Sequence, residues 1–243
     1  MTQIIALVVS LIPSAAIFFF LRNGLKQDDE HKKHCGRMFV RGFFAAIPIF
    51  LLSLVCNLFW KALGLFPDSQ LAADLFLSLI LTAGSEEIVK YMLLNKTLQE
   101  KKETISWLQI IAYQAIIGLA FGVNEDLLYA LSTNVGQILV RGVAMGHVGY
   151  GLLMGYFRGK GMKTGKKSYA VLAFCLPYLM HALYNFSLKD SVVQNDIFVF
   201  TAVTLAVLDL MLWIFFVLKL RKWRNETGYT EALFRKETKE ELS

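Results

Sequence analysis

The sequence predicts an all-α membrane protein, a polytopic bundle of about seven transmembrane helices. Hydrophobic residues make up 56% of the 243 residues and charged residues only 18%, whereas a soluble domain is about 45–50% apolar and about 25% charged. Seven stretches reach the length of about 20 predominantly apolar residues that one crossing of a bilayer requires. They are residues 3–21, 38–60, 71–94, 105–131, 138–157, 169–188 and 197–218.

No polar stretch between these segments is long enough to fold separately. We therefore expect one transmembrane domain over residues 1–220, followed by a charged cytoplasmic tail over residues 221–243. The net charge of +6 does not indicate nucleic-acid binding, because the basic residues fall in short loops. The three cysteines, Cys35, Cys56 and Cys175, lack the spacing of a metal site or a disulfide framework, so we interpret them as apolar filler.

The basic residues also predict the orientation of the chain. Cytoplasmic loops carry an excess of lysine and arginine, which here places the N-terminus outside and the C-terminus in the cytoplasm. Apart from Lys61 and Lys189, lysine and arginine are concentrated in the alternate segments 22–41, 96–102, 158–167 and 219–224. The first apolar stretch has no basic residue before it and is too long for the core of a signal peptide, so we expect an uncleaved span.

Ionisable side chains inside the apolar stretches are the candidates for function. An acidic residue at the centre of a transmembrane helix costs about 2.5–3.5 kcal/mol on insertion scales, so it must face the protein interior or water. The segment Gly84-Ser85-Glu86-Glu87-Ile88-Val89-Lys90 places two adjacent carboxylates and a lysine in the third stretch. The later stretches add Glu125, Asp126, His147, His181, Asn185 and Asp209.

Helical spacing groups these residues into faces. Glu86 and Lys90 are four apart and can pair, whereas Glu87 points about 100° away and is expected to be the glutamate left free to activate water. His181 and Asn185 share a face. Glycines at intervals of four let neighbouring helices approach closely, so helices three to six should form a tight bundle. These pairs are Gly118 and Gly122, Gly142 and Gly146, and Gly151 and Gly155.

The polar residues also have structural explanations. An ion pair with Lys90 or Arg141 explains one buried glutamate but not two adjacent ones. A lone histidine in a membrane helix is more often an interhelical hydrogen bonder, but two histidines at the level of three carboxylates favour a functional site. Asp126 is a weaker candidate because it can face another direction, and Asp209 is left out because it is isolated.

Paired glutamates and two histidines in a water-accessible cavity suit hydrolysis in two ways. In the first, His147, His181 and Glu125 bind a divalent metal such as zinc, with a fourth position open to water and one of the paired glutamates as general base. In the second there is no metal: a desolvated glutamate deprotonates water directly, while His181 and Asn185 stabilise the oxyanion. The sequence has neither HExxH nor GxSxG. The predicted catalytic residues are Glu86, Glu87, Glu125, His147 and His181, supported by Lys90 and Asn185.

Four of these segments resemble, in the same order, the PrsW family of intramembrane proteases, distant relatives of the CAAX-processing and bacteriocin-immunity (CPBP) membrane proteases. They are Glu86-Glu87-Ile88-Val89-Lys90, Phe121-Gly122-x-x-Glu125-x-x-x-Tyr129, His147 with its following glycines, and His181-x-x-Tyr184-Asn185. The resemblance covers about half of the chain and implies that Glu86, Glu87 and His181 are needed for activity. The family usually has Glu-Asn where this chain has Glu125-Asp126, so no family role transfers to Asp126.

The resemblance also implies a multi-pass protein of the bacterial cell membrane. Its implied activity is site-1 cleavage of a single-span, membrane-anchored anti-sigma factor on the extracytoplasmic side, which releases a stress-response sigma factor after further proteolysis. A proton-coupled transporter is the main alternative, with Glu86, Lys90, Glu125 and the histidines as a proton relay. The sequence shows neither the duplicated halves nor the discontinuous spans that would favour a transporter. A membrane scaffold, the third interpretation, needs none of these acids.

Overall fold

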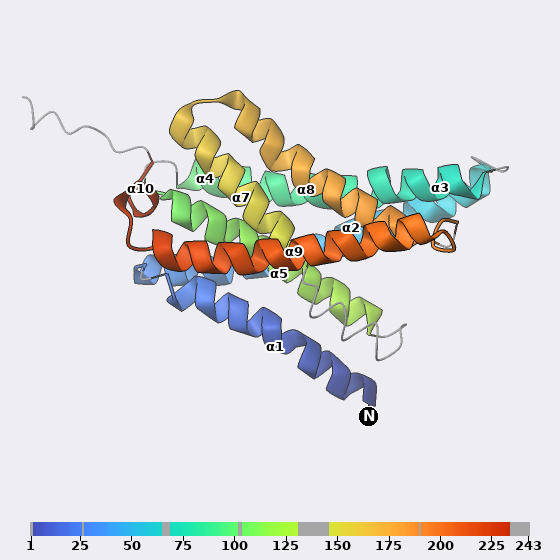
Figure 1. The fold of residues 1–243 in the computed structure, drawn as a ribbon, viewed down its shortest axis with the longest axis horizontal. Coiled ribbons are helices and arrows are strands. Elements are labelled where there is room, and N and C mark those ends of the chain that lie inside the picture. The colour runs from blue at the N-terminus through green and yellow to red at the C-terminus, as the bar shows by residue number, and fades with distance from the viewer. Residues whose placement is uncertain are drawn as a thin grey trace, which may run out of the picture.

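The computed structural model describes residues 2–25, 27–64, 69–101, 104–130, 146–189 and 191–233. Within these ranges the protein is helical and has no strand beyond an isolated bridge between Ser106 and Ala232, which confirms the all-α class. The elements, labelled in Figure 1, are α1 (Thr2–Asn23), α2 (Asp29–Leu63), α3 (Gln70–Phe76), the π-helix η1 (Leu77–Gly84), α4 (Ser85–Glu100), α5 (Trp107–Tyr129), α7 (Gly146–Thr164), α8 (Lys167–Ser187), α9 (Asp196–Trp223) and α10 (Thr227–Thr230).

Helix α5 forms the centre of the bundle. Its sequence is mostly apolar without one polar face, which is typical of a helix that is buried on all sides, and residues 110–121 are all buried. Helices α1, α2, α4 and α7 pack against it, and Figure 1 shows α5 crossing behind α9 in the middle of the molecule. Side chains of α5 that face these neighbours are therefore shielded from the bilayer.

Glycines allow α5 and α7 to cross at close range. A Cβ atom added at Gly151 or Gly155 would lie 2.5 or 2.8 Å from backbone atoms of α5. A Cβ atom added at Gly118 would overlap the backbone carbonyl of His147. The expected close packing is thus confirmed for these three glycines, whereas Gly142 lies outside the described residues.

Five of the described helices are long and apolar enough to cross a membrane: Ile4–Asn23, Asp29–Phe59, Trp107–Leu128, Lys167–Ser187 and Asp196–Trp223. The expected span 71–94 is not one α-helix but the succession of α3, η1 and α4. The expected span 138–157 lies partly outside the described residues, and the rest of it belongs to α7, which is rich in glycine. The number of seven spans therefore stays a prediction.

The π-helix η1 directly precedes the two adjacent glutamates. Such wide turns are rare and occur frequently at functional sites. The hydroxyl of Ser85 donates a hydrogen bond to the carbonyl of Leu81 and lies 3.1 Å from the carbonyl oxygen of Thr82, so it satisfies carbonyl groups of the widened turn. The sequence did not predict η1, which ends where α4 begins and so places Glu86 and Glu87 in the first turn of α4.

The basic ends of several helices meet at one end of the bundle. Figure 1 shows α10 beside the C-terminal end of α9, with the end of α1 nearby. The Arg224 side chain donates to the carbonyl of Gly24 at 2.8 Å, and the rings of Trp223 and Tyr229 stack with centroids 4.4 Å apart. The first part of the expected tail is therefore held against the bundle, and residues 234–243 lie outside the described ranges.

The substitution Gly118→Ala tests the close crossing of α5 and α7. The added methyl group would overlap a backbone carbonyl, and overpacking of this kind typically costs about 1–3 kcal/mol, so we expect Tm in detergent to fall. Gly36→Ala is the matched control, because a Cβ atom there meets nothing within 4 Å and alanine is the better helix former. Equal Tm values for the two variants would contradict the crossing geometry.

Candidate hydrolytic site

Lys90 lies at the centre of a buried polar network that joins α4, α5, α7 and α8. Its side chain is fully buried, and Nζ lies 2.7 Å from Glu87 Oε1 and donates to His147 Nδ1 at 2.8 Å. Glu86 Oε2 is 3.6 Å from the same ammonium, and the Phe121 ring centroid is 4.9 Å from it. One buried cation thus ties the two adjacent glutamates to a histidine on another helix.

The two glutamates differ in a way opposite to expectation. Glu87 is fully buried, and its Oε1 accepts hydrogen bonds from Lys90 and, at 2.9 Å, from Nδ1 of His181. Glu86 is farther from Lys90, its side chain is 13% exposed, and it lines a cavity. The expectation that Glu87 is the free glutamate is therefore wrong. Glu87, three residues before Lys90, places its carboxylate 2.7 Å from the ammonium, whereas Glu86, four residues before Lys90, lies 3.6 Å from it.

The two histidines face each other between α7 and α8. The ring centroids of His147 and His181 are 5.0 Å apart and the rings are nearly perpendicular, at 85°. His147 Nε2 lies 2.8 Å from Glu125 Oε2 and 3.8 Å from Glu86 Oε2. Because the ammonium of Lys90 can only donate, His147 Nδ1 accepts, and the proton of the neutral ring lies on Nε2, directed at Glu125; a metal ion at Nε2 would have to displace that proton.

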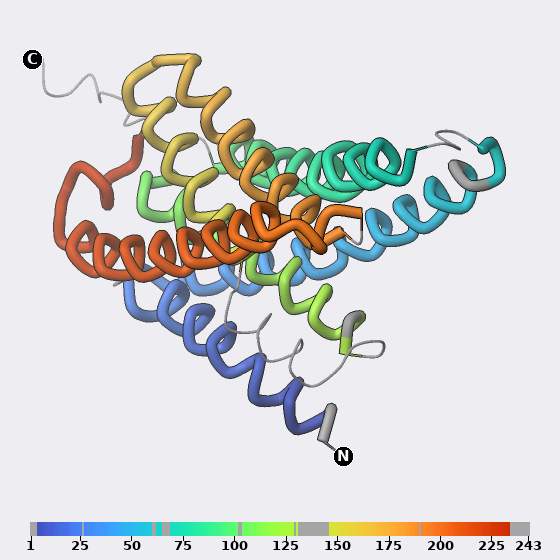
Figure 2. The backbone as a smooth tube through the Cα atoms, turned by 45° about the vertical axis from the view of Figure 1, so that its right-hand side comes forward, coloured from blue at the N-terminus to red at the C-terminus, as the bar shows by residue number. Residues whose placement is uncertain are grey.

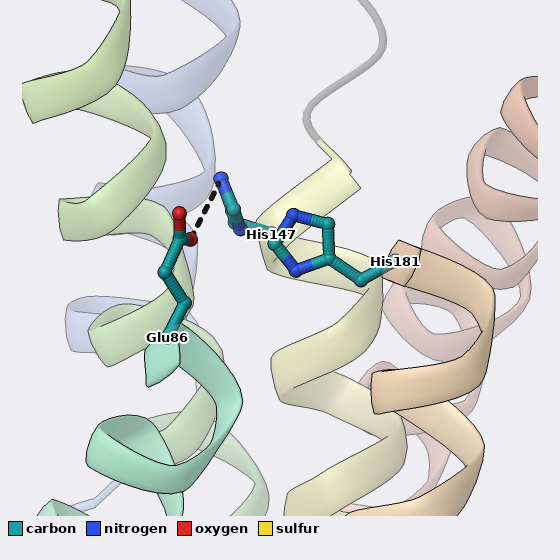
Figure 3. Close-up of side chains that lie close together, drawn as sticks. All are labelled: Glu86, His147 and His181. Carbon is teal, nitrogen blue, oxygen red and sulfur yellow. Dashed lines mark ion pairs between the residues drawn. The ribbon is translucent and has the colours of Figure 1, made fainter. Parts of the chain in front are cut away.

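Glu86, His147 and His181 point toward one another from α4, α7 and α8 (Figure 3). One potential ligand atom from each of the three lies within 4.8 Å of the other two. The metal-binding set expected from the sequence contains the same two histidines but has Glu125 in place of Glu86. In the structure, Glu125 is the hydrogen-bond partner of His147.

The donor set fits a divalent metal ion. One carboxylate and two imidazoles form several catalytic zinc sites, which keep a further position open. Glu87 accepts the Nδ1 proton of His181, so Nε2 of that ring carries a lone pair, and metal-binding histidines generally donate their other N–H to a carboxylate in this way. Glu86 and Glu87 share one ammonium, that of Lys90, at 3.6 and 2.7 Å.

A polar cavity opens beside this group. Its volume is about 70 Å³, and a water needs about 10–15 Å³ on this measure, so several waters fit. The wall includes Glu125, Asp126, His147, His181, Asn185 and Asp209. Water can therefore reach the histidines, as hydrolysis requires.

Two residues near the cavity were not predicted as part of the site. The Tyr150 ring stacks on His181 with centroids 5.2 Å apart. In the sequence, only its position three residues after His147, on the same helix face, could have indicated that Tyr150 lies near the site. Asp209 of α9 is 2% exposed, and neither carboxylate oxygen has a hydrogen-bond partner among the described residues. Its carboxylate fits against α7 because Gly149 has no side chain. In the sequence, only the presence of an acidic residue in the last apolar stretch could have indicated that Asp209 belongs to the site.

The structure gathers every predicted site residue around the cavity or the lysine: Glu86, Glu87, Lys90, Glu125, His147, His181 and Asn185. Arg141 lies outside the described residues. Carboxylates, imidazoles and a water-sized cavity, enclosed among apolar helices of membrane-spanning length, define the class of a membrane-embedded hydrolase.

Comparison with known proteins assigns this class to a family. A model of the PrsW family intramembrane metalloproteases matches residues 30–218, and the chain belongs to this family. Protease PrsW of Oceanobacillus iheyensis is 27% identical over 198 residues, 79% of this chain and 83% of the relative. Protease PrsW of Clostridioides difficile is 25% identical over 229 residues, 90% and 91% of the two chains, and that of Bacillus subtilis is 24% identical over 176 residues, 70% and 76%. No solved structure matches the chain significantly.

Family membership confirms the resemblance found in the sequence. The protein is a multi-pass protein of the bacterial membrane and a member of an intramembrane peptidase family. The family description as metalloproteases agrees with the donor set of Glu86, His147 and His181. It does not favour the alternative of a proton-coupled transporter.

The substitution Lys90→Met tests the buried network. It leaves Glu87 buried without its cation, and removing one partner of a buried ion pair costs about 3–5 kcal/mol, so we expect a large fall in Tm. The double variant Lys90→Met/Glu87→Gln removes both charges and should recover most of that stability. Thermal unfolding of both variants in detergent is the measurement, and an equal loss in the two would show that the pair is not the source of the effect.

Proposed function

We propose that this protein hydrolyses a peptide bond of a single-span membrane protein within the bilayer, and that Glu86, His147 and His181 hold the divalent metal ion of the site. The observation that carries the proposal is the convergence of these three side chains, with ligand atoms within 4.8 Å, beside a cavity that water can enter. We take zinc as the metal, because it suits two imidazoles and a carboxylate.

The bound metal would polarise the scissile carbonyl and make a bound water more acidic. Glu125 is assigned the proton transfer, because its side chain is 27% exposed and lines both the polar cavity and a second, larger cavity. It can therefore take a proton from water on one side and deliver it to the leaving amine on the other.

The remaining residues act by positioning and charge. Glu87 holds the ring of His181 through Nδ1, and Lys90 holds Glu87 and His147. Asn185 lies one turn beyond His181 on α8 and lines the polar cavity. We assign its amide the role of donating a hydrogen bond to the oxyanion that forms as water attacks the carbonyl.

The proposed substrate is a membrane-anchored anti-sigma factor, cleaved at site 1 on the extracytoplasmic side in stress signalling. This is the activity implied by the resemblance to the family. With it we propose the topology expected from the sequence: the N-terminus outside, seven spans within residues 1–220, and a cytoplasmic tail over 221–243. The site's position supports this orientation, because Glu125 and His147 lie near the ends of α5 and α7 that are opposite the basic ends.

Cleavage in reconstituted proteoliposomes that contain a single-span anti-sigma factor tests the proposal. We expect wild-type protein to cut the substrate, and Glu86→Gln and His181→Ala to lower kcat by about 10²-fold or more, as removal of transition-state charge stabilisation does. Glu87→Gln should also slow cleavage, through loss of the hydrogen bond that orients His181. Glu100→Gln is the matched control, because Glu100 ends the same helix and pairs with Arg41 at the surface.

The outcome that contradicts the site is cleavage at the wild-type rate by all three site variants. Proton-coupled solute uptake by the wild-type protein in liposomes, without any proteolysis, would establish the transporter instead.

A further inference from the structure

A second cavity lies on the other side of the site's carboxylates, between α2, the η1–α4 junction and α5. Its volume is about 210 Å³, about three times the 70 Å³ of the polar cavity. Glu86 lines this second cavity, and Glu125 lines both. The two cavities therefore share the carboxylate of Glu125, to which proton transfer is assigned above.

The walls of the second cavity are mainly apolar. Phe50 of α2 and Phe121 and Leu128 of α5 supply aromatic and aliphatic surface. The hydroxyl of Ser53, also in the wall, is already engaged, because it donates to the carbonyl of Leu81 at 3.3 Å. Apart from Glu86 and Glu125, no charged residue lines this cavity in the described part of the chain. A cavity of this chemistry favours an apolar side chain over a charged one.

Asn124 adds an unpartnered acceptor to this wall. Its side chain is buried, with the residue 5% exposed, and Nδ2 donates to the carbonyl of Phe43 at 3.2 Å. Its Oδ1 has no hydrogen-bond partner among the described residues. Buried polar atoms are normally paired, and an exception calls for a ligand or a water.

The wall of the second cavity includes a half-exposed residue of α2. Phe50 is 50% exposed, and the neighbouring α2 residues Leu51 and Leu54 are 53% and 47% exposed, as expected for a helix surface in contact with acyl chains. Figures 1 and 2 both show α2 running beside the α3–η1–α4 segment. An apolar segment of a membrane protein could therefore reach the cavity from within the bilayer.

We propose that this second cavity is a specificity pocket, which holds an apolar side chain of the substrate next to the scissile bond. The inference rests on the proposed function, because it places the substrate's peptide beside Glu86 and Glu125, with water on the opposite side. The occupant is a side chain of the size of leucine, methionine or phenylalanine.

The substitution Ala46→Phe tests the pocket, because Ala46 lies in its wall and a phenyl group there would reduce its volume. Proteoliposomes are given a panel of single-span model substrates, and mass spectrometry identifies the bonds that are cut. Each substrate is then remade with leucine or alanine at either residue flanking the cut bond. Wild-type protein should prefer leucine by about tenfold or more in kcat/KM at one flanking position, as hydrophobic pockets do. Ala46→Phe should abolish that preference, so that the leucine and alanine substrates are cut with nearly equal kcat/KM.

Two further variants complete the experiment. Ala62→Phe is the matched control, since it makes the same change in the same helix at an exposed position outside the pocket, and it should keep the wild-type preference. Phe50→Ala enlarges the pocket at a half-exposed residue and should improve cleavage beside tryptophan. This variant tests the pocket if Ala46→Phe fails to accumulate in the membrane.

Cleavage with unchanged preference in Ala46→Phe and Phe50→Ala would overturn the pocket and leave the protease assignment standing. Failure of the wild-type protein to cut any substrate of the panel would overturn both.

Discussion

The buried ammonium of Lys90 is the interaction on which the arrangement of the site depends. A charged amine is stable in a protein interior only with close anionic and hydrogen-bonding partners, and Lys90 finds them in Glu87 at 2.7 Å and His147 at 2.8 Å. Glu87 in turn holds His181. Once Lys90 is placed, the first half of α4, the start of α7 and the C-terminal half of α8 are fixed relative to one another, and the two imidazoles face Glu86.

Backbone features bring the helices within reach of that lysine. Gly118 lets the backbone of His147 lie directly against α5, and the π-helix η1 sets the point at which α4 begins with its two glutamates. The same packing leaves a polar cavity on one side of Glu125 and a larger apolar cavity on the other. This separation suits hydrolysis in a membrane, because water and an apolar peptide need different surroundings to reach the same carboxylate.

The sequence predicted the helical class and the identity of the polar residues because charge inside an apolar stretch has few stable explanations. It did not predict how these residues pair. Adjacent glutamates are distinguished only by their exact rotation, and the expectation for Glu87 was wrong for that reason. The π-helix has no sequence signature of its own. Asp209 could not be linked to the site from the sequence, because its contact with Gly149 on a facing helix is visible only in the structure. The apolar cavity lies between α2, the η1–α4 junction and α5, which are distant in sequence, so no local pattern could indicate it.

The central claim is that Glu86 joins His147 and His181 as a metal ligand while Glu125 does not. The measurement is zinc content by mass spectrometry, after the purified proteins are loaded with zinc and dialysed, for wild type, Glu86→Gln and Glu125→Gln. We predict about one zinc ion per chain in the wild type and most of it retained in Glu125→Gln, but at least about a tenfold loss in Glu86→Gln. Loss in Glu125→Gln with retention in Glu86→Gln, or an active wild-type preparation without metal, would contradict the claim.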